Sequence, residues 1–112
     1  MIHNEAPKIK ERLSQIEGVK SVTRGWPKSF AQLPCVAISK AADTPVNFKD
    51  DKEYITELEY YIRIFTNRVS DADALAETVD AAMEEMGYIR TFSYDDDDSE
   101  VRMAALRYRK YV

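Results

Sequence analysis

An apolar stripe at helical spacing in the second half of the chain is the feature that most constrains the fold. Its members are Ala72, Leu75, Ala76, Val79, Ala82, Met83 and Met86. Ser70 can cap the start of this helix, and Asp71 and Asp73 place negative charge at its positive end. Gly87 suits the left-handed position that ends a helix. Such a stripe must be buried against a second layer, so the rest of the chain has to supply one.

The best candidate for that layer is a long strand predicted over residues 53–67. Alternation places one apolar set on a single face: Leu58, Tyr60, Ile62 and Ile64. The opposite face is mixed, with Tyr61 and Phe65 among charged residues. A second strand, opened by Pro34 and predicted over residues 35–40, is apolar or small on both faces. We therefore expect residues 35–40 to be covered on both sides.

The N-terminal segment predicts another helix, over residues 5–17. Four apolar residues fall near one of its faces: Ile2, Ile9, Leu13 and Ile16. Pro7 suits the first turn, and Gly18 suits the position that closes the helix. A short strand is predicted over residues 19–24. Gly25-Trp26-Pro27 then breaks regular structure, and residues 27–33 form a loop.

Residues 41–52 are polar and predict a loop, in which Phe48 is an isolated apolar residue. The end of the chain predicts two strands, 88–94 and 100–111, joined by a hairpin loop at Asp95–Ser99. Val101 and Met103 share one parity in the last strand, whereas Ala104, Leu106 and Tyr108 share the other. We expect a bulge near Ala104 and Ala105 to reconcile the two sets.

The predicted order of elements, α-β-β-β-α-β-β, indicates the α+β class. With 112 residues the chain has the length of one domain, residues 1–112, and can bury a core without disulfides or metals. We expect a single, mostly antiparallel sheet of about four to five strands with both helices packed on one face. The other face would carry Tyr61 and Phe65.

The composition argues against several classes of partner. The net charge is −4, whereas a domain of this size that binds nucleic acid usually has a basic excess. Attraction to a membrane through basic residues is disfavoured for the same reason. No apolar run approaches the ~20 residues of a spanning helix, and residues 1–10 lack an apolar signal core. We expect synthesis in the cytoplasm, with no specific nucleic acid binding and no membrane partner.

The residues that usually carry catalysis are scarce. The single histidine, His3, lies near the terminus, and the single cysteine, Cys35, reads as a small core residue. The glycines are isolated at positions 18, 25 and 87, so there is no phosphate-binding loop. Only carboxylates remain. We therefore predict no enzyme activity, no catalytic residue, no cofactor and no metal.

Two clusters allow alternatives. The acids Asp95–Asp98 read best as a solvated turn, while a site for a hard cation or a contact with a basic partner stays open. Aromatic residues around the long strand could suggest base stacking: Tyr54, Tyr60, Tyr61 and Phe65. They are interleaved with Glu57 and Glu59, which repel a phosphate backbone, so core and interface packing is the better interpretation.

An ordered set of short runs resembles a known family. The runs are Arg24–Pro27, Leu33–Ile38, Asp43–Pro45, Tyr61–Thr66, Ser70–Ala72 and Met103–Arg109. In this order they resemble the tail-completion proteins of long-tailed bacteriophages and prophages, of the SPP1 type, and more distantly the lambda-type tail terminators. The resemblance covers roughly residues 5–110 and departs from the pattern at Asp95–Asp98.

That resemblance implies a non-enzymatic structural protein of the virion tail. It implies a homo-oligomeric ring, expected to be a hexamer, that caps the head-proximal end of the tail tube. The partners would be the tail tube protein and the head–tail connector proteins. Unexplained aromatic residues are typical of ring-forming surfaces, so we expect Trp26, Phe48, Tyr61 and Phe65 at the subunit interface. The alternatives are a head–tail joining or neck protein of the same virion, and a host α+β module that binds a ligand or partner.

Overall fold

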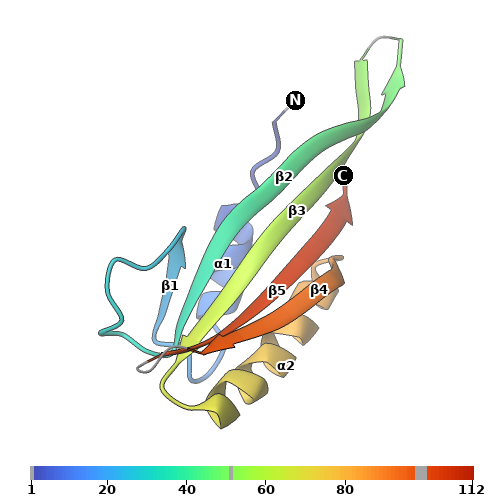
Figure 1. Ribbon diagram of the computed structural model, residues 1–112. Helices are drawn as coiled ribbons and strands as arrows, with labels where there is room; N and C mark the ends of the chain where they lie inside the picture. Colours follow the sequence, from blue (N-terminus) through green and yellow to red (C-terminus); the bar gives the residue numbers. More distant parts are fainter. Residues whose placement is uncertain (1, 51, 98–100) are drawn as a thin grey trace.

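A sheet backed by two helices forms the protein in this computed structural model, which describes residues 2–50, 52–97 and 101–112 (Figure 1). In these residues the elements are α1 (Ala6–Ser14), β1 (Ser21–Arg24), β2 (Cys35–Lys49), β3 (Lys52–Thr66), α2 (Val69–Glu85), β4 (Ile89–Asp97) and β5 (Arg102–Tyr111). The strand order is β1-β2-β3-β5-β4. The β1–β2 pair is parallel and the other pairs are antiparallel. The predicted α+β class is confirmed.

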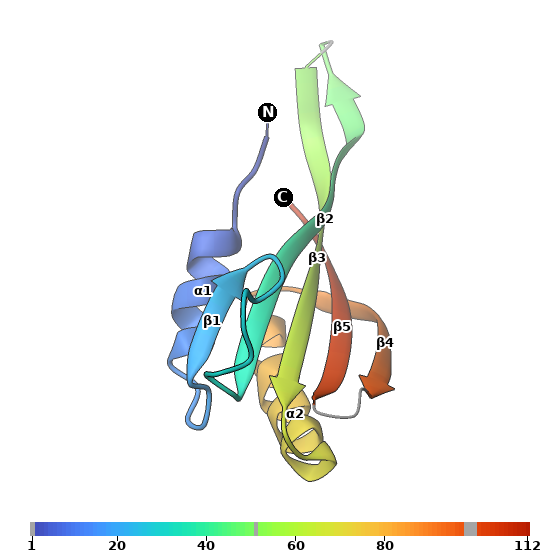
Figure 2. The same cartoon turned by 60° about the vertical axis from the view of Figure 1, so that its left-hand side comes forward.

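Both helices cover the same face of the sheet, as two views show (Figures 1 and 2). Ile9 and Leu13 of α1 and Val79 and Met83 of α2 are fully buried in this layer. The sheet contributes alternate residues of its central strands: Val36, Ile38, Leu58, Tyr60, Ile62, Ile64, Ala104, Leu106 and Tyr108. The stripe that predicted α2 is thus buried because its period matches one face of a helix lying on a flat apolar surface.

A smaller core lies on the opposite side of the sheet, which we call the outer face. It is built from Cys35, Ala37, Phe65, Met103 and Ala105, with Leu33 and Val101 packed against it. The prediction that residues 35–40 are covered on both sides holds for Cys35–Ile38, which are all buried.

The prediction of a bulge near Ala104 and Ala105 is wrong. The β3–β5 register runs without a shift from Glu57↔Tyr111 to Thr66↔Arg102. Both parities of β5 are apolar because the sheet is covered on both faces there, not because the strand changes phase. The irregularity lies instead in β4, between Arg90 and Phe92.

Two helix boundaries also differ from the prediction. The first helix is shorter than residues 5–17 and ends at Ser14, and Ile2 lies outside it with 85% of its surface exposed. Gly18 has φ +94° but follows a separate turn. Ser70 is not the cap of α2, because Arg68 occupies that position and no side chain caps it.

The predicted loop over residues 41–52 is largely strand. β2 continues to Lys49 and pairs with β3 as far as Lys49↔Lys52, with register shifts between Lys40 and Ala42 and between Pro45 and Phe48. Alternation is lost in the sequence because this ribbon is exposed rather than packed on a core. Asp95–Asp97 likewise belong to β4 rather than to a loop, while Asp98 and Ser99 lie outside the described residues.

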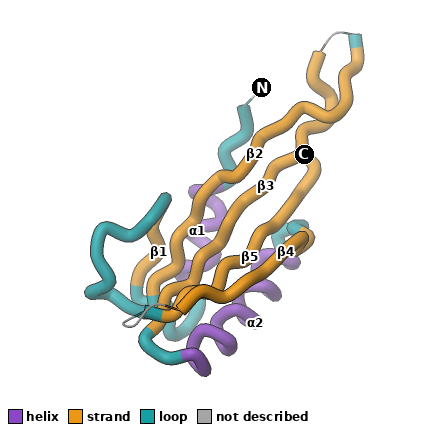
Figure 3. Tube along the Cα trace, in the orientation of Figure 1, coloured by secondary structure: helices purple, strands orange, loops and turns teal. Residues whose placement is uncertain are grey.

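The β2–β3 hairpin extends well past the other strands, which makes the molecule long and narrow at 52 × 24 × 23 Å (Figure 3). The chain end still pairs with β3 through Thr56, whose N–H donates to the Val112 carbonyl oxygen at 2.8 Å. Beyond Thr56 the sheet has two strands. We call the described residues of this two-stranded part, 46–50 and 52–55, the arm.

Candidate functional site

On the outer face, arginines pack against aromatic rings. The guanidinium carbon of Arg63 lies 5.1 Å from the ring centroid of Trp26 and 4.7 Å from that of Tyr61. Arg107, opposite Tyr61 in the β3–β5 register, lies 5.5 Å from the same tyrosine ring. Ring faces attract cations, and neighbouring side chains of paired strands reinforce each other. The outcome is a continuous stack across β3 and β5.

One arginine of this stack forms an ion pair with a carboxylate. Arg107 donates a hydrogen bond to the Glu59 carboxylate, and this contact is the main reason that the pKa of Arg107 is raised. Arg109 lies 5.4 Å from the Tyr111 ring. The Nε atoms of Arg63, Arg107 and Arg109 are buried and have no hydrogen-bond partner among the described residues. This surface is therefore a packed platform suited to contact.

The loop between β1 and β2 covers one end of the outer face. The ring centroids of Trp26 and Phe30 lie 5.5 and 5.1 Å from that of Phe65. Gly25, with φ +76°, donates its N–H to the Ile38 carbonyl oxygen at 2.8 Å, and this turn sends the loop back over the sheet. Phe65 is 2% exposed beneath these rings, whereas Trp26 is 60% exposed.

The arm presents apolar side chains to solvent. Val46 and Phe48 are both exposed, Phe48 to 62%. Just after β2, Asp50 has φ 54°, a conformation that Asp tolerates better than most residues. Two-stranded ribbons are marginally stable on their own, so an arm with apolar side chains is suited to pack against another surface.

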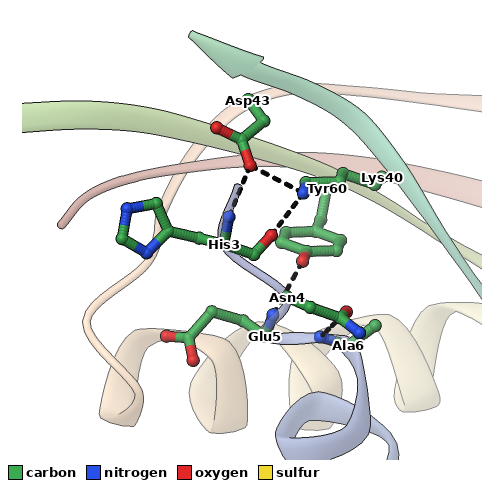
Figure 4. A network of polar contacts seen from close by, with 7 residues as sticks. All are labelled: His3, Asn4, Glu5, Ala6, Lys40, Asp43 and Tyr60. Atoms are coloured by element: carbon green, nitrogen blue, oxygen red, sulfur yellow. Dashed lines mark hydrogen bonds and ion pairs between the residues drawn. The ribbon is translucent and has the colours of Figure 1, made fainter. Parts of the chain in front are cut away.

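The segment before α1 is fastened to the root of the hairpin (Figure 4). The N–H of His3 and the Nζ of Lys40 both donate to Oδ2 of Asp43, at 2.8 and 2.7 Å. Lys40 also donates to the His3 carbonyl oxygen. These contacts hold the pKa of the Asp43 carboxyl below its ordinary value, with the Lys40 hydrogen bond as the largest cause. We call this set the N-terminal clamp.

The register shift at Ala41 makes the N-terminal clamp possible. In a regular strand, residues three apart point to opposite faces. Here Lys40 pairs with Tyr60 and Asp43 with Leu58, and Tyr60 and Leu58 both face the helices. Lys40 and Asp43 therefore share the helix side of the sheet. The Tyr60 hydroxyl oxygen also accepts a hydrogen bond from the Glu5 N–H at 3.0 Å.

The four predicted interface residues have different environments. Trp26 and Phe48 are both exposed. Trp26 lies on the loop that covers one end of the outer face, whereas Phe48 lies on the arm. Tyr61 is half-buried in the arginine stack, and Phe65 is buried under the protein's own loop. The fold thus joins Trp26, Tyr61 and Phe65 into one region, with Phe48 far along β2. Their contact with another subunit stays a prediction.

The candidate residues for catalysis or metal binding do not form a common site. His3 contacts Asp43 through its backbone, and Cys35 is a buried free cysteine in the smaller core. Asp95 and Asp96 are exposed on β4. Within the described ranges, no group of three His, Cys, Asp or Glu residues could hold a metal ion. Tyr60 and Tyr61 lie on opposite faces, so they do not form one stacking platform, and the side chain of Tyr54 lies outside the described residues.

Sequence reasoning missed the arginine stack, the N-terminal clamp and the exposed pair Phe92 and Tyr94 on β4, whose rings are 5.5 Å apart. The stack had a signal, because Tyr61-x-Arg63 and Arg107-x-Arg109 alternate on strands that were correctly predicted. The N-terminal clamp had none, because it depends on a register shift and on a contact between distant segments.

Comparison with models of protein families and with curated proteins finds no match for this chain. The resemblance to tail-completion proteins therefore stays a prediction. Among the described residues, no helix has the length and apolar character needed to cross a membrane.

Proposed function

We propose that the protein is a non-enzymatic structural subunit of a phage or prophage tail. In this proposal, copies of the chain form a ring, expected to be a hexamer, that caps the head-proximal end of the tail tube. The ring also forms the interface to the head connector. The proposal rests on the family resemblance together with the surfaces described above.

The arm is the single observation that carries the proposal. It projects beyond the helices and the other strands, and it exposes Val46 and Phe48. A closed ring repeats one head-to-tail contact, in which an element of one copy meets a different surface of the next. An arm with apolar side chains is suited to lie on a neighbouring subunit, where these residues would leave water.

The outer face of the neighbouring subunit is the surface that we propose receives the arm. It carries flat rings and stacked arginines, among them Trp26, Tyr61 and Arg107. Aromatic residues and arginine are enriched at the centres of protein interfaces and among the residues that contribute most to binding. An exposed apolar arm and an aromatic outer face on the same chain support a head-to-tail contact between copies.

The test is light scattering during size-exclusion chromatography, on the chain alone and mixed with the tail tube protein. We expect a closed oligomer in at least one of these samples. Phe48→Ser should prevent its formation while leaving the monomer's unfolding free energy within about 0.5 kcal/mol, because the side chain is exposed.

The matched control is Ile89→Ser, which changes a residue of similar exposure, 59%, on β4 rather than on the arm. It should assemble like the unmodified chain. A chain that stays monomeric even with the tail tube protein would refute the proposal. If the Phe48→Ser variant assembles as well as the unmodified chain, the arm is not the contact between subunits.

A further inference from the structure

A hollow of about 350 Å³ opens on the outer face beside the loop between β1 and β2. Its lining residues are Trp26, Phe30, Phe65, Asp96, Val101 and Met103. The Phe65 ring centroid lies 5.5 Å from that of Trp26 and 5.1 Å from that of Phe30. The hollow is at the small end of the range for ligand sites, which is a suitable volume for one long side chain.

The strand register places a carboxylate beside these rings. Asp96 of β4 pairs with Met103 of β5, and Met103 pairs with Phe65 of β3. The three side chains therefore form a row across the outer face. Within the part of the chain that the structure describes, the Asp96 carboxylate has no ion pair.

The exposed rings of Trp26 and Phe30, which lie over the buried Phe65, form with the Asp96 carboxylate a site suited to a cation. The face of an aromatic ring attracts positive charge, and the attraction strengthens where water is excluded. The Asp96 carboxylate adds an opposite charge at the rim. The apolar walls at Met103 and Val101 suit the methylene stem that a basic side chain buries beneath its charged group.

The same face shows which cation it accommodates. Arg63 already lies against both Trp26 and Tyr61, within 5.1 and 4.7 Å of their centroids. A guanidinium is planar and weakly hydrated, so it stacks on rings better than a compact ammonium does. We propose that the hollow binds an arginine side chain presented by a partner protein. The monomer contains the whole hollow, so this inference does not depend on the tail-ring proposal.

The probe is the peptide acetyl-Gly-Arg-Gly-amide, compared with its citrulline counterpart, which has the same shape and no charge. Trp26 is the single tryptophan, so one indole N–H resonance in a ¹H–¹⁵N spectrum reports on the hollow. We expect that resonance to shift and saturate with the arginine peptide. The citrulline peptide should bind about 5- to 30-fold more weakly, given the size of cation–ring attraction.

Variants separate the charge from the rings. Asp96→Asn should weaken the arginine peptide about 2- to 5-fold. The matched control, Asp95→Asn, changes the neighbouring acid, which pairs with Ala104 on the helix side, and should leave binding unchanged. Phe30→Leu should also weaken binding, with the remaining amide resonances unchanged to show that the fold persists.

Three results would overturn the inference. The first is equal affinity for the arginine and citrulline peptides. The second is equal affinity for the arginine peptide and for acetyl-Gly-Lys-Gly-amide, which carries the same charge on a compact ammonium. The third is binding that persists in both Asp96→Asn and Phe30→Leu. The ring proposal would be unaffected by any of them, because its test reads the oligomeric state and uses the arm.

Discussion

At the scale of single residues, the face of the sheet on which a side chain lies decides its role. Tyr60 is buried under the helices and its hydroxyl accepts a hydrogen bond from Glu5, while its neighbour Tyr61 lies in the arginine stack. Tyr108 is also buried under the helices and donates to Asp80 at 2.8 Å. The adjacent residues Tyr60 and Tyr61 therefore contribute to different faces of the sheet, one to the core and one to the outer face.

The N-terminal clamp predicts a pH-dependent stability difference. Because the pKa of Asp43 is below its ordinary value of 3.8 in the folded chain, its ionised form stabilises the fold above that pH. This stabilisation is lost as the pH falls through the folded-state pKa. Asp43→Asn should lower the unfolding free energy by about 1 kcal/mol at pH 7, and the difference should shrink below about pH 4.

Urea unfolding of both proteins at neutral and acid pH measures this difference. Glu77→Gln is the control, because Glu77 is exposed on α2 and should show no such gap at either pH. A gap for Asp43→Asn that is equal at pH 7 and at pH 3 would contradict the assigned role of the carboxylate.

At the scale of elements, the helices and the sheet depend on each other. In neither helix does the side chain of the N-cap residue cap the first turn, although Asn4 Oδ1 accepts a hydrogen bond from the Ala6 N–H at 3.3 Å. Most of their stability comes from the apolar layer that they share with β2, β3 and β5. The outer face has a smaller core, which the loop between β1 and β2 completes with Trp26 and Phe30. The helices are thus held by one layer of side chains, whereas the central strands β2, β3 and β5 contribute to both.

Met83→Ala tests the shared layer. Met83 is fully buried between α2 and the sheet, so its truncation removes apolar contacts and leaves a cavity. We expect the unfolding free energy to fall by about 3 kcal/mol. The adjacent Glu84→Ala, on the exposed side of α2, should change it by less than about 0.5 kcal/mol. Similar losses for both variants in chemical denaturation would argue against this packing.

At the scale of the whole molecule, the fold combines a well-packed body with an arm that has little to pack against. The body buries residues on both sides of its central strands, as at Val36 and Ala37. The arm continues two of those strands into solvent, which produces the long shape seen in Figures 1 and 3. The packed part and the exposed part of this hairpin are therefore separate, and the proposed interaction is assigned to the exposed part.

Hydrogen exchange should reveal this division. In the monomer, the amides of Val46 and Phe48 should exchange far faster than those of Ile62 and Ile64, because the arm can open without unfolding the body. Assembly should then slow exchange in the arm, if the arm is the interface. Equal protection of the arm and the body in the monomer would contradict the division.

The sequence predicted secondary structure best where apolar residues recur at a regular period along an element that packs against another layer. The stripe of α2 and the alternation of β3 indicated two layers correctly, since each period matches the geometry of its element. The sequence-based prediction failed at residues 41–52, because an exposed two-stranded ribbon has no alternation of apolar and polar residues. It also failed at Ala104 and Ala105, because a strand that is buried on both faces has apolar residues at both parities, as a bulged strand does. Of the four predicted interface residues, it could not tell that Phe65 is covered by the loop that carries Trp26.

The amino-acid sequence by itself determined the α+β class, the helix stripes and the central strands, because those follow from local periodicity. Only the tertiary structure decided that β2 and β3 project as an arm, that arginines and rings stack on the outer face, and that Asp96 lines one hollow with three aromatic residues. These features depend on strand register and on contacts between residues far apart in the chain. A local pattern does not specify which strand lies beside which.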